Sequence, residues 1–281
     1  MFGLPSSAVP SVPTMAGRFV ALGDSFTEGV GDWNAARPNG VKGWADRVAR
    51  QLARQDPAWE YANLAIRSKR LRQIVAEQLE PALALEPTLI TVYAGGNDIL
   101  DLRTDVDALL AQYEQFVAAL SATGARIVLF TGYDLKISPL LEPFRRRHDV
   151  YNDGVRRISA AHGTDLLDFW ALTAYRDPRM WDPDRMHMST AGHRYMTARV
   201  LDVLGVTYVP DLPDDDPERP GLRDALRAER QWVTDWVLPM VGRKLRGVTL
   251  GDDLEPRWPD PIRPADGMKR LARARMARLA G

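Results

Sequence analysis

From Arg18 onward, the chain alternates short apolar runs with longer segments of helical period. The apolar runs are bounded by Gly, Asp or Asn and have the composition of buried parallel strands. They are Phe19–Gly23, Tyr61–Ala65, Leu89–Ala94, Ile127–Thr131 and Asp165–Phe169. Amphipathic segments predict helices around residues 43–55, 69–80, 104–122, 149–161 and 189–204. Alternating strands and helices indicate βαβ units. The pattern therefore predicts a flavodoxin-like three-layer α/β/α sandwich with a central parallel sheet of five strands and a C-terminal helical extension.

The pattern changes near residue 210. Residues 210–220 read PDLPDDDPERP, an acidic, proline-rich stretch that is typical of a linker. Beyond it we expect a helix over Leu222–Arg246, an irregular stretch over 247–262 and a short basic helix at the end. The predicted units are a flexible N-terminal extension (1–17), a main domain (18–209), a linker (210–221) and a C-terminal extension (222–281).

The helix expected over Leu222–Arg246 carries many arginines beside Trp232 and Trp236. Such a face could contact a membrane surface. Acidic residues interrupt its basic side, however, and this favours packing of its apolar face on the main domain or on a second copy. The sequence makes no prediction of the oligomeric state.

Composition narrows the classes of function. The 281 residues carry no formal net charge, so no overall field would attract nucleic acid. The absence of cysteine excludes disulfides, thiolate metal sites and a cysteine nucleophile. No apolar stretch is long enough to predict a spanning helix, and the N-terminal residues lack the basic start and continuous apolar core of a secretion signal. We therefore expect a cytoplasmic protein.

The first candidate for chemistry is Ser25, in the stretch GDSFTEG at 23–29, directly after the first predicted strand. A serine on a tight strand-to-helix turn is exposed at the edge of the sheet, and the following helix offers free backbone N–H groups. This arrangement suits a nucleophile whose product is an oxyanion. The motif alone is equally typical of a turn with a capping serine.

A second candidate pair, Asp184 and His187, lies near the end of the main domain. An Asp three residues before a His can hold one ring nitrogen while the other faces a serine, which supplies the orienting and general-base roles within one loop. Taken alone, the pair could also be a surface loop with an incidental histidine.

Two further stretches follow predicted strands. Asn97, in GGND at 95–98, has an amide that can donate to a developing negative charge. A backbone N–H in residues 63–65 could complete such an oxyanion hole. Either stretch alone would be an ordinary turn or strand end.

Together, these stretches resemble the SGNH (GDSL-type) hydrolase family over roughly residues 18–205. The resemblance implies that Ser25 is the nucleophile, that Asp184 and His187 complete the triad, and that Ser25, Ala65 and Asn97 form the oxyanion hole. It also implies hydrolysis of carboxylic esters, sometimes thioesters, without a metal or organic cofactor. Ala65 stands where the family usually has a glycine, and Ser68 replaces another.

Pocket shape is the property that the sequence leaves open. Trp33, Trp44, Tyr133 and Trp181 could line a substrate site, although Trp44 could equally pack the core beneath the first helix. The expected substrate is a small-molecule ester with a short or medium acyl chain. A carbohydrate O-deacetylase, a lysophospholipase or thioesterase and an acyltransferase are alternatives of the same class. A non-catalytic module of the same fold is an alternative from another class, as is a flavodoxin-like nucleotide binder, although the chain lacks a P-loop.

Overall fold

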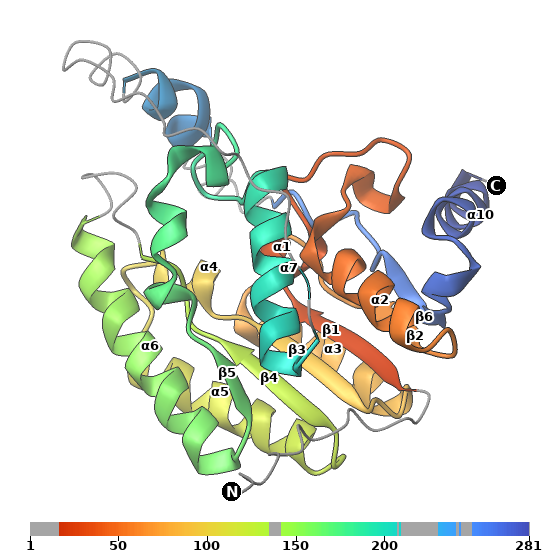
Figure 1. Cartoon of the computed structure of the whole chain (residues 1–281). Coiled ribbons are helices and arrows are strands. Elements are labelled where there is room, and N and C mark those ends of the chain that lie inside the picture. The colour runs from red at the N-terminus through yellow and green to blue at the C-terminus, as the bar shows by residue number, and fades with distance from the viewer. Residues whose placement is uncertain are drawn as a thin grey trace, which may run out of the picture.

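A computed structural model of the chain describes residues 17–134, 142–206, 208, 230–239, 242 and 249–280. In these ranges a six-stranded sheet lies between helices (Figure 1). The strands are β1 (Arg18–Gly23), β2 (Glu60–Asn63), β3 (Leu89–Tyr93), β4 (Arg126–Phe130), β5 (Asp165–Leu167) and β6 (Trp258–Ile262). Their order is β5-β4-β3-β1-β2-β6; the first five are parallel, and β6 runs antiparallel to β2. The five parallel strands have the order of flavodoxin-like sheets.

Helices cover both faces of the sheet. The longer ones are α2 (Gly43–Gln55), α3 (Leu71–Ala84), α5 (Val106–Ser121), α6 (Glu142–His162), α7 (Thr190–Leu204) and α10 (Met268–Ala280). Short helical turns are α1 (Ser25–Glu28), η1 (Pro38–Gly40), α4 (Gly96–Ile99), η3 (Phe169–Ala171), η4 (Thr173–Arg176), η5 (Pro178–Met180) and η7 (Pro264–Asp266). The element η6 (Val233–Val237) is a π-helical stretch within the helical residues 230–239. Helices α2 and α7 pack together on one face, and α3, α5 and α6 cover the other (Figure 1).

Strand β1 shows how the sequence builds this sandwich. Successive side chains of a strand point to opposite faces of the sheet. Phe19 and Ala21 accordingly belong to the cluster under α2 and α7, whereas Val20 and Leu22 belong to the cluster under α3, α5 and α6. All four are fully buried. A strand buried on both faces reads as a continuous apolar run, which is the run that the sequence presents at this position.

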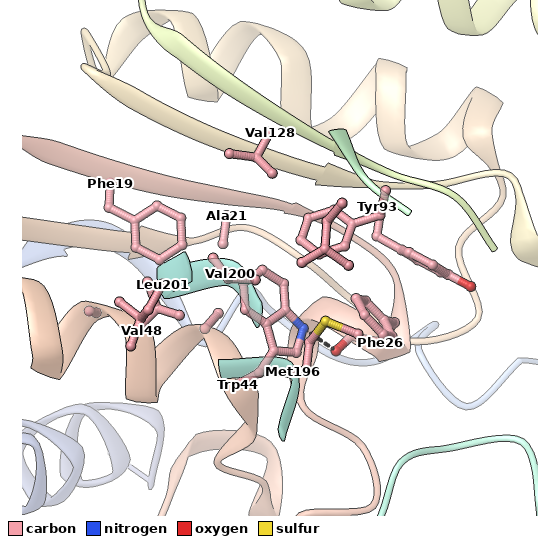
Figure 2. Packing of buried hydrophobic residues seen from close by; sticks show 14 of the residues in the cluster. Phe19, Ala21, Phe26, Trp44, Val48, Tyr93, Val128, Met196, Val200 and Leu201 are labelled. Atoms are coloured by element: carbon pink, nitrogen blue, oxygen red, sulfur yellow. Dashed lines mark hydrogen bonds between the residues drawn. The ribbon is translucent and has the colours of Figure 1, made fainter. Parts of the chain in front are cut away.

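Trp44, at the start of α2, fills the first of these clusters (Figure 2). Its indole Nε1–H donates to the Phe26 carbonyl oxygen at 3.0 Å. The Phe26 ring in turn stacks on Tyr93 at a centroid distance of 4.0 Å. Phe26 lies in the short helix α1, so this packing fixes the turn at the end of β1 against α2 and β3.

The structure confirms the five predicted strands and the helices of the main domain to within a few residues at most ends, although α6 begins well before the predicted residue 149. The predicted total of five strands is wrong because β6 comes from residues that were expected to be irregular. Its sequence, WPDPI, contains two prolines. Proline cannot donate a ladder hydrogen bond and is tolerated mainly in edge strands. The edge position of β6 is the setting in which such a sequence can still pair.

Other predictions for the chain ends are not tested. The predicted extension over 1–17 falls, up to residue 16, outside the described residues, as does the linker over 210–221. The helix expected over Leu222–Arg246 is described only over residues 230–239 and at 242, where it is helical. In the described ranges, every helix is too short or too polar to cross a bilayer.

Arg257, one residue before β6, joins the C-terminal extension to the main domain. Its fully buried guanidinium donates to the Asp46 carboxylate at 2.7 and 3.1 Å. It also donates to the carbonyl oxygens of Glu28 and Lys42, both at 2.9 Å. A buried charge is tolerated when it is paired and its hydrogen bonds are satisfied. The extension is thereby fixed to the end of helix α1.

We expect Arg257→Ala to lower the free energy of unfolding by about 3–5 kcal/mol, because Asp46 would be left buried without its charge partner. Urea denaturation measures the change. The matched control is Arg270→Ala, which removes an exposed pair with Asp266 and should change stability by less than about 1 kcal/mol. Equal losses in the two variants would contradict this account of the contact.

Candidate active site

The turn after β1 places Ser25 at the carboxyl end of a central strand. Gly23 has φ +140°, and a side chain there would collide with the Tyr93 carbonyl oxygen, so glycine is required. Asp24 caps the short helix α1 by accepting the Phe26 N–H at 3.1 Å. The Ser25 hydroxyl lies in a pocket at this edge of the sheet. Ligands of such sheets bind at this edge.

His187 and Asp184 reach Ser25 from a loop that is distant in sequence. The His187 Nε2 atom lies 3.0 Å from the Ser25 Oγ, and its Nδ1 lies 2.5 Å from the Asp184 Oδ2. The other Asp184 oxygen, Oδ1, accepts the backbone N–H groups of Met186 and His187, both at 2.9 Å. The carboxylate therefore organises the loop and the imidazole together. The structure brings the three predicted side chains into one hydrogen-bonded chain.

The electrostatics of the pair follow from this contact. Burial alone would lower the pKa of His187, but the hydrogen bond and the negative charge of Asp184 outweigh it and raise that pKa above its ordinary 6.5. Burial likewise acts to raise the pKa of Asp184, and the hydrogen bond and charge of His187 overcome it, so that pKa is lowered. Asp184 therefore stays ionised and favours the protonated form of His187.

Asp24 lies beside this chain and has a structural role. Burial raises its pKa to about 7, against the opposing effect of the Phe26 N–H. Its Oδ2 accepts from the Asn97 side-chain amide at 3.1 Å. Asp98 is similar: its Oδ2 accepts the Leu71 N–H at 2.9 Å, and burial raises its pKa. Both carboxyl groups thus stabilise, by hydrogen bonds, the backbone turns that surround Ser25.

Asn97 lies at the pocket, but its amide hydrogens already have acceptors. Its Nδ2 donates to Asp24 at 3.1 Å and to the Lys69 carbonyl oxygen at 3.0 Å. To donate to an oxyanion, the amide must share or exchange one of these bonds. The predicted oxyanion role of Asn97 stays a prediction, and its observed role is to join the three turns that surround Ser25.

The prediction for Ala65 is corrected. Its backbone N–H donates to the Asn63 side-chain oxygen at 3.1 Å, and the residue is fully buried and does not line the pocket. Ser68, three residues further along the same loop, does line it. In the described part of the chain, the Ser68 N–H has no hydrogen-bond acceptor. Ser68 therefore supplies the free donor that Ala65 cannot.

The signal for Ser68 was present in the sequence. The resemblance marks this position as one where a glycine is usual. Ser68 has φ +67°, which lies in the left-handed region that glycine adopts without strain. A position where the family usually has glycine indicates a left-handed backbone conformation. This conformation sets the direction of the Ser68 N–H.

The pocket has a volume of about 250 Å³. Of the four predicted lining residues, Tyr133 and Trp181 do line it, and their rings lie 4.7 Å apart. Trp33 does not: it is 56% exposed, and its indole donates to Asp182 at 3.2 Å. Trp44 does not either, because it is fully buried in the core beneath α2 (Figure 2). The pocket role predicted for Trp33 and Trp44 is therefore wrong, and for Trp44 the alternative of core packing is the one observed.

Sequence reasoning missed several lining residues. Tyr93 and Phe169 lie near the ends of two different predicted strands, and their apolar rings indicated core packing only. Thr249 and Leu250 come from the C-terminal extension, where no sequence signal connects them to the site. In the described ranges, no group of three or more His, Asp or Glu side chains is placed to hold a metal ion.

Residues 21–195 match the model of the GDSL-like Lipase/Acylhydrolase family, so the chain belongs to this family of esterases and hydrolases. The resemblance inferred from the sequence is thereby confirmed. No curated protein matches the chain in sequence.

Solved structures share the fold. LAE5, an alpha/beta hydrolase enzyme from the metagenome of Lake Arreo in Spain, matches with a TM-score of 0.57 and 24% identity, over 67% of this chain and 95% of its own. Axe2, an acetylxylan esterase from Geobacillus stearothermophilus, matches with a TM-score of 0.56 and 21% identity, over 69% of this chain and 97% of its own. About a third of the present chain has no counterpart in these matches.

Titration of the histidines tests the electrostatics directly. We expect His187 to titrate above 6.5, whereas burial lowers the pKa of both His148 and His193 to about 4. Asp184→Asn should lower the pKa of His187, because it removes the charge that stabilises the imidazolium. NMR of the histidine ring protons from about pH 4 to 9 measures these values. A His187 resonance that does not respond to Asp184→Asn would refute the assignment.

Proposed function

We propose that the protein is a serine hydrolase that cleaves carboxylic esters through an acyl-enzyme on Ser25. The observation that carries the proposal is the hydrogen-bonded chain from the Ser25 Oγ through both ring nitrogens of His187 to Asp184. This constellation is the one that nucleophilic acyl transfer requires. Membership of the GDSL-like family supports it.

In the first step, His187 takes the proton of the Ser25 hydroxyl as Oγ attacks the ester carbonyl carbon. The carbonyl oxygen becomes an oxyanion, which the backbone N–H groups of Ser25 and Ser68 and the amide of Asn97 would stabilise. His187 then gives its proton to the leaving alcohol, and the acyl group remains on Ser25. Asp184 holds the imidazole in the required tautomer and stabilises its cation.

In the second step, water attacks the acyl-enzyme and gives its proton to His187. The carbonyl re-forms, Ser25 regains the proton, and the carboxylic acid leaves. Side chains and water carry every proton in this scheme, so the proposal calls for no metal or organic cofactor.

The pocket favours a short or medium acyl group. A cavity of about 250 Å³ lies at the small end of ligand sites, and Tyr133, Phe169 and Trp181 give it an aromatic wall. A lysophospholipase, thioesterase or acyltransferase would use the same constellation. Retention of all three catalytic side chains in hydrogen-bonding positions argues against a non-catalytic binding module.

Carbohydrate O-deacetylation is a second candidate. Aromatic side chains in the pocket can stack on sugar rings, and the acetylxylan esterase Axe2 has a similar fold. Comparison of p-nitrophenyl acetate with an acetylated xylooligosaccharide tests it. Release of acetate from the sugar at a higher kcat/KM than from the aryl ester would favour this substrate class.

We expect Ser25→Ala and His187→Ala each to lower kcat/KM on p-nitrophenyl butyrate by several orders of magnitude, because the nucleophile and its base act as one unit. The control is Ser121→Ala, at the end of α5 and outside the pocket lining, which should leave turnover unchanged. Equal turnover by the native protein and Ser25→Ala would exclude the mechanism.

The oxyanion donors can be separated by two further variants. Asn97→Ala should lower kcat by about 10²–10³-fold, as the loss of one such donor typically does. Ser68→Gly keeps the backbone N–H and suits φ +67°, so kcat should stay within a few-fold of the native value. If Ser68→Gly lost as much activity as Asn97→Ala, the hydroxyl rather than the N–H of Ser68 would be the active group.

A further inference from the structure

Part of the pocket wall comes from outside the family domain. The family match covers residues 21–195, yet Thr249 and Leu250 line the pocket that contains Ser25. Leu250 is apolar and 57% exposed. Ligand pockets are lined mostly by apolar side chains, so Leu250 is placed to contact a ligand in this pocket.

The segment that carries Leu250 is a turn closed by its own hydrogen bonds. The Thr249 N–H and hydroxyl donate to the Asp252 carboxylate at 2.8 and 2.6 Å. Gly251 lies against the Arg67 carbonyl oxygen, where any side chain would collide. Because Arg67 precedes Ser68, the turn packs directly on the loop that carries the proposed oxyanion donor.

Polar contacts connect the chain after this turn to the main domain. Five residues after Asp252, the Arg257 guanidinium donates to the carbonyl oxygen of Glu28, the last residue of helix α1. The Glu28 carboxylate accepts three hydrogen bonds from Arg67, at 2.7, 2.9 and 2.7 Å. The side-chain amide of Asn39 donates at 3.0 Å to both the Glu28 carboxylate and the Glu255 carbonyl oxygen. The extension, helix α1 and the Ser68 loop thus share one hydrogen-bond network.

The extension meets the site at a second place. The buried indole of Trp232 donates its Nε1–H to the Asp184 carbonyl oxygen at 2.6 Å. The Arg185 guanidinium lies over the same ring, 5.3 Å from its centroid. Arg185 has φ +55°, so the loop between Asp184 and His187 holds a backbone conformation that a non-glycine residue adopts only with support.

We propose that the C-terminal extension completes the active site at these two places. The turn Thr249–Asp252 is a specificity-determining wall that contacts an apolar part of the ester, and Trp232 is a positioning residue for Asp184. This inference rests on the proposed esterase function, since it concerns which esters that site accepts and how its acid–base pair is held.

The wall is tested with Leu250→Ala, with Leu279→Ala as the control; Leu279 is an exposed leucine on α10 outside the pocket lining. Two ester series are used: p-nitrophenyl esters from acetate to octanoate, and acetate esters of alcohols from ethanol to octanol. We expect Leu250→Ala to lower the ratio of long-chain to short-chain kcat/KM about tenfold in one series, because apolar contact is lost. Leu279→Ala should leave both ratios unchanged.

If Leu250→Ala is folded and active and keeps the native ratio of long-chain to short-chain kcat/KM in both series, the proposed role of the turn as a specificity-determining wall is wrong. This result differs from failure of the esterase function itself, which would appear as turnover that survives Ser25→Ala.

The positioning role is tested with Trp232→Phe, which removes the indole N–H, and with Trp236→Phe, an exposed tryptophan on the same helical segment, as its control. We expect Trp232→Phe to lower kcat about ten- to a hundredfold with KM nearly unchanged, because Asp184 is less well placed. The acid limb of the kcat/KM profile should move to lower pH, since a weaker contact with Asp184 raises the pKa of His187 less. Trp236→Phe should do neither.

A Trp232→Phe enzyme that loses stability but keeps the native acid limb would show that Trp232 is structural only, and would overturn its positioning role.

Discussion

The hydrogen bond between Asp184 and His187 is the contact on which the site depends. One carboxylate oxygen binds the imidazole at 2.5 Å, and the other binds two backbone N–H groups of the same loop. The loop conformation, the ring orientation and the raised pKa of His187 therefore have a common origin. The imidazole can meet Ser25 only because β1 and the loop before α7 end at the same edge of the sheet.

A second buried group, the Glu28 carboxylate, organises the opposite side of the pocket. Glu28 is the last residue of helix α1, which begins with Ser25, and is fully buried. Its carboxylate accepts hydrogen bonds from Arg67, which precedes Ser68, and its carbonyl oxygen accepts one from Arg257. Through this residue, the C-terminal extension contacts both the helix that begins with Ser25 and the loop that carries Ser68. The extension and the family domain thus form one structural unit around the pocket in the described part of the chain.

Most of the fold could be predicted because burial of a strand or helix requires a simple pattern of apolar residues in the sequence. Strands such as β1 are buried on both faces and read as apolar runs, and the helices that cover them have an apolar stripe. Strand β6 could not be predicted, because its prolines contradict the local rule and only the free edge of β2 allows the pairing. Pairing with a distant edge is a tertiary property that no local pattern contains.

The site divides in the same way. Ser25, Asp184 and His187 are marked by side-chain chemistry and short spacing, so the sequence indicates them. The choice between Ala65 and Ser68 depends on which N–H is already bonded, and the Asn63 side chain decides it. Trp44, at the start of α2, and Tyr133, just after β4, are both aromatic, but Trp44 lies in the core and Tyr133 lines the pocket. The short or medium acyl chain of the ester and the cytoplasmic localisation stay predictions.

The most direct test of the central claim is to trap the nucleophile. A fluorophosphonate forms a stable adduct with a serine that a neighbouring histidine activates, and peptide mass spectrometry locates it. The account predicts one adduct per chain, on Ser25, formed in step with loss of esterase activity and strongly slowed in His187→Ala. Inactivation with Ser25 unmodified, or modification of Ser25 at the same rate without His187, would contradict it.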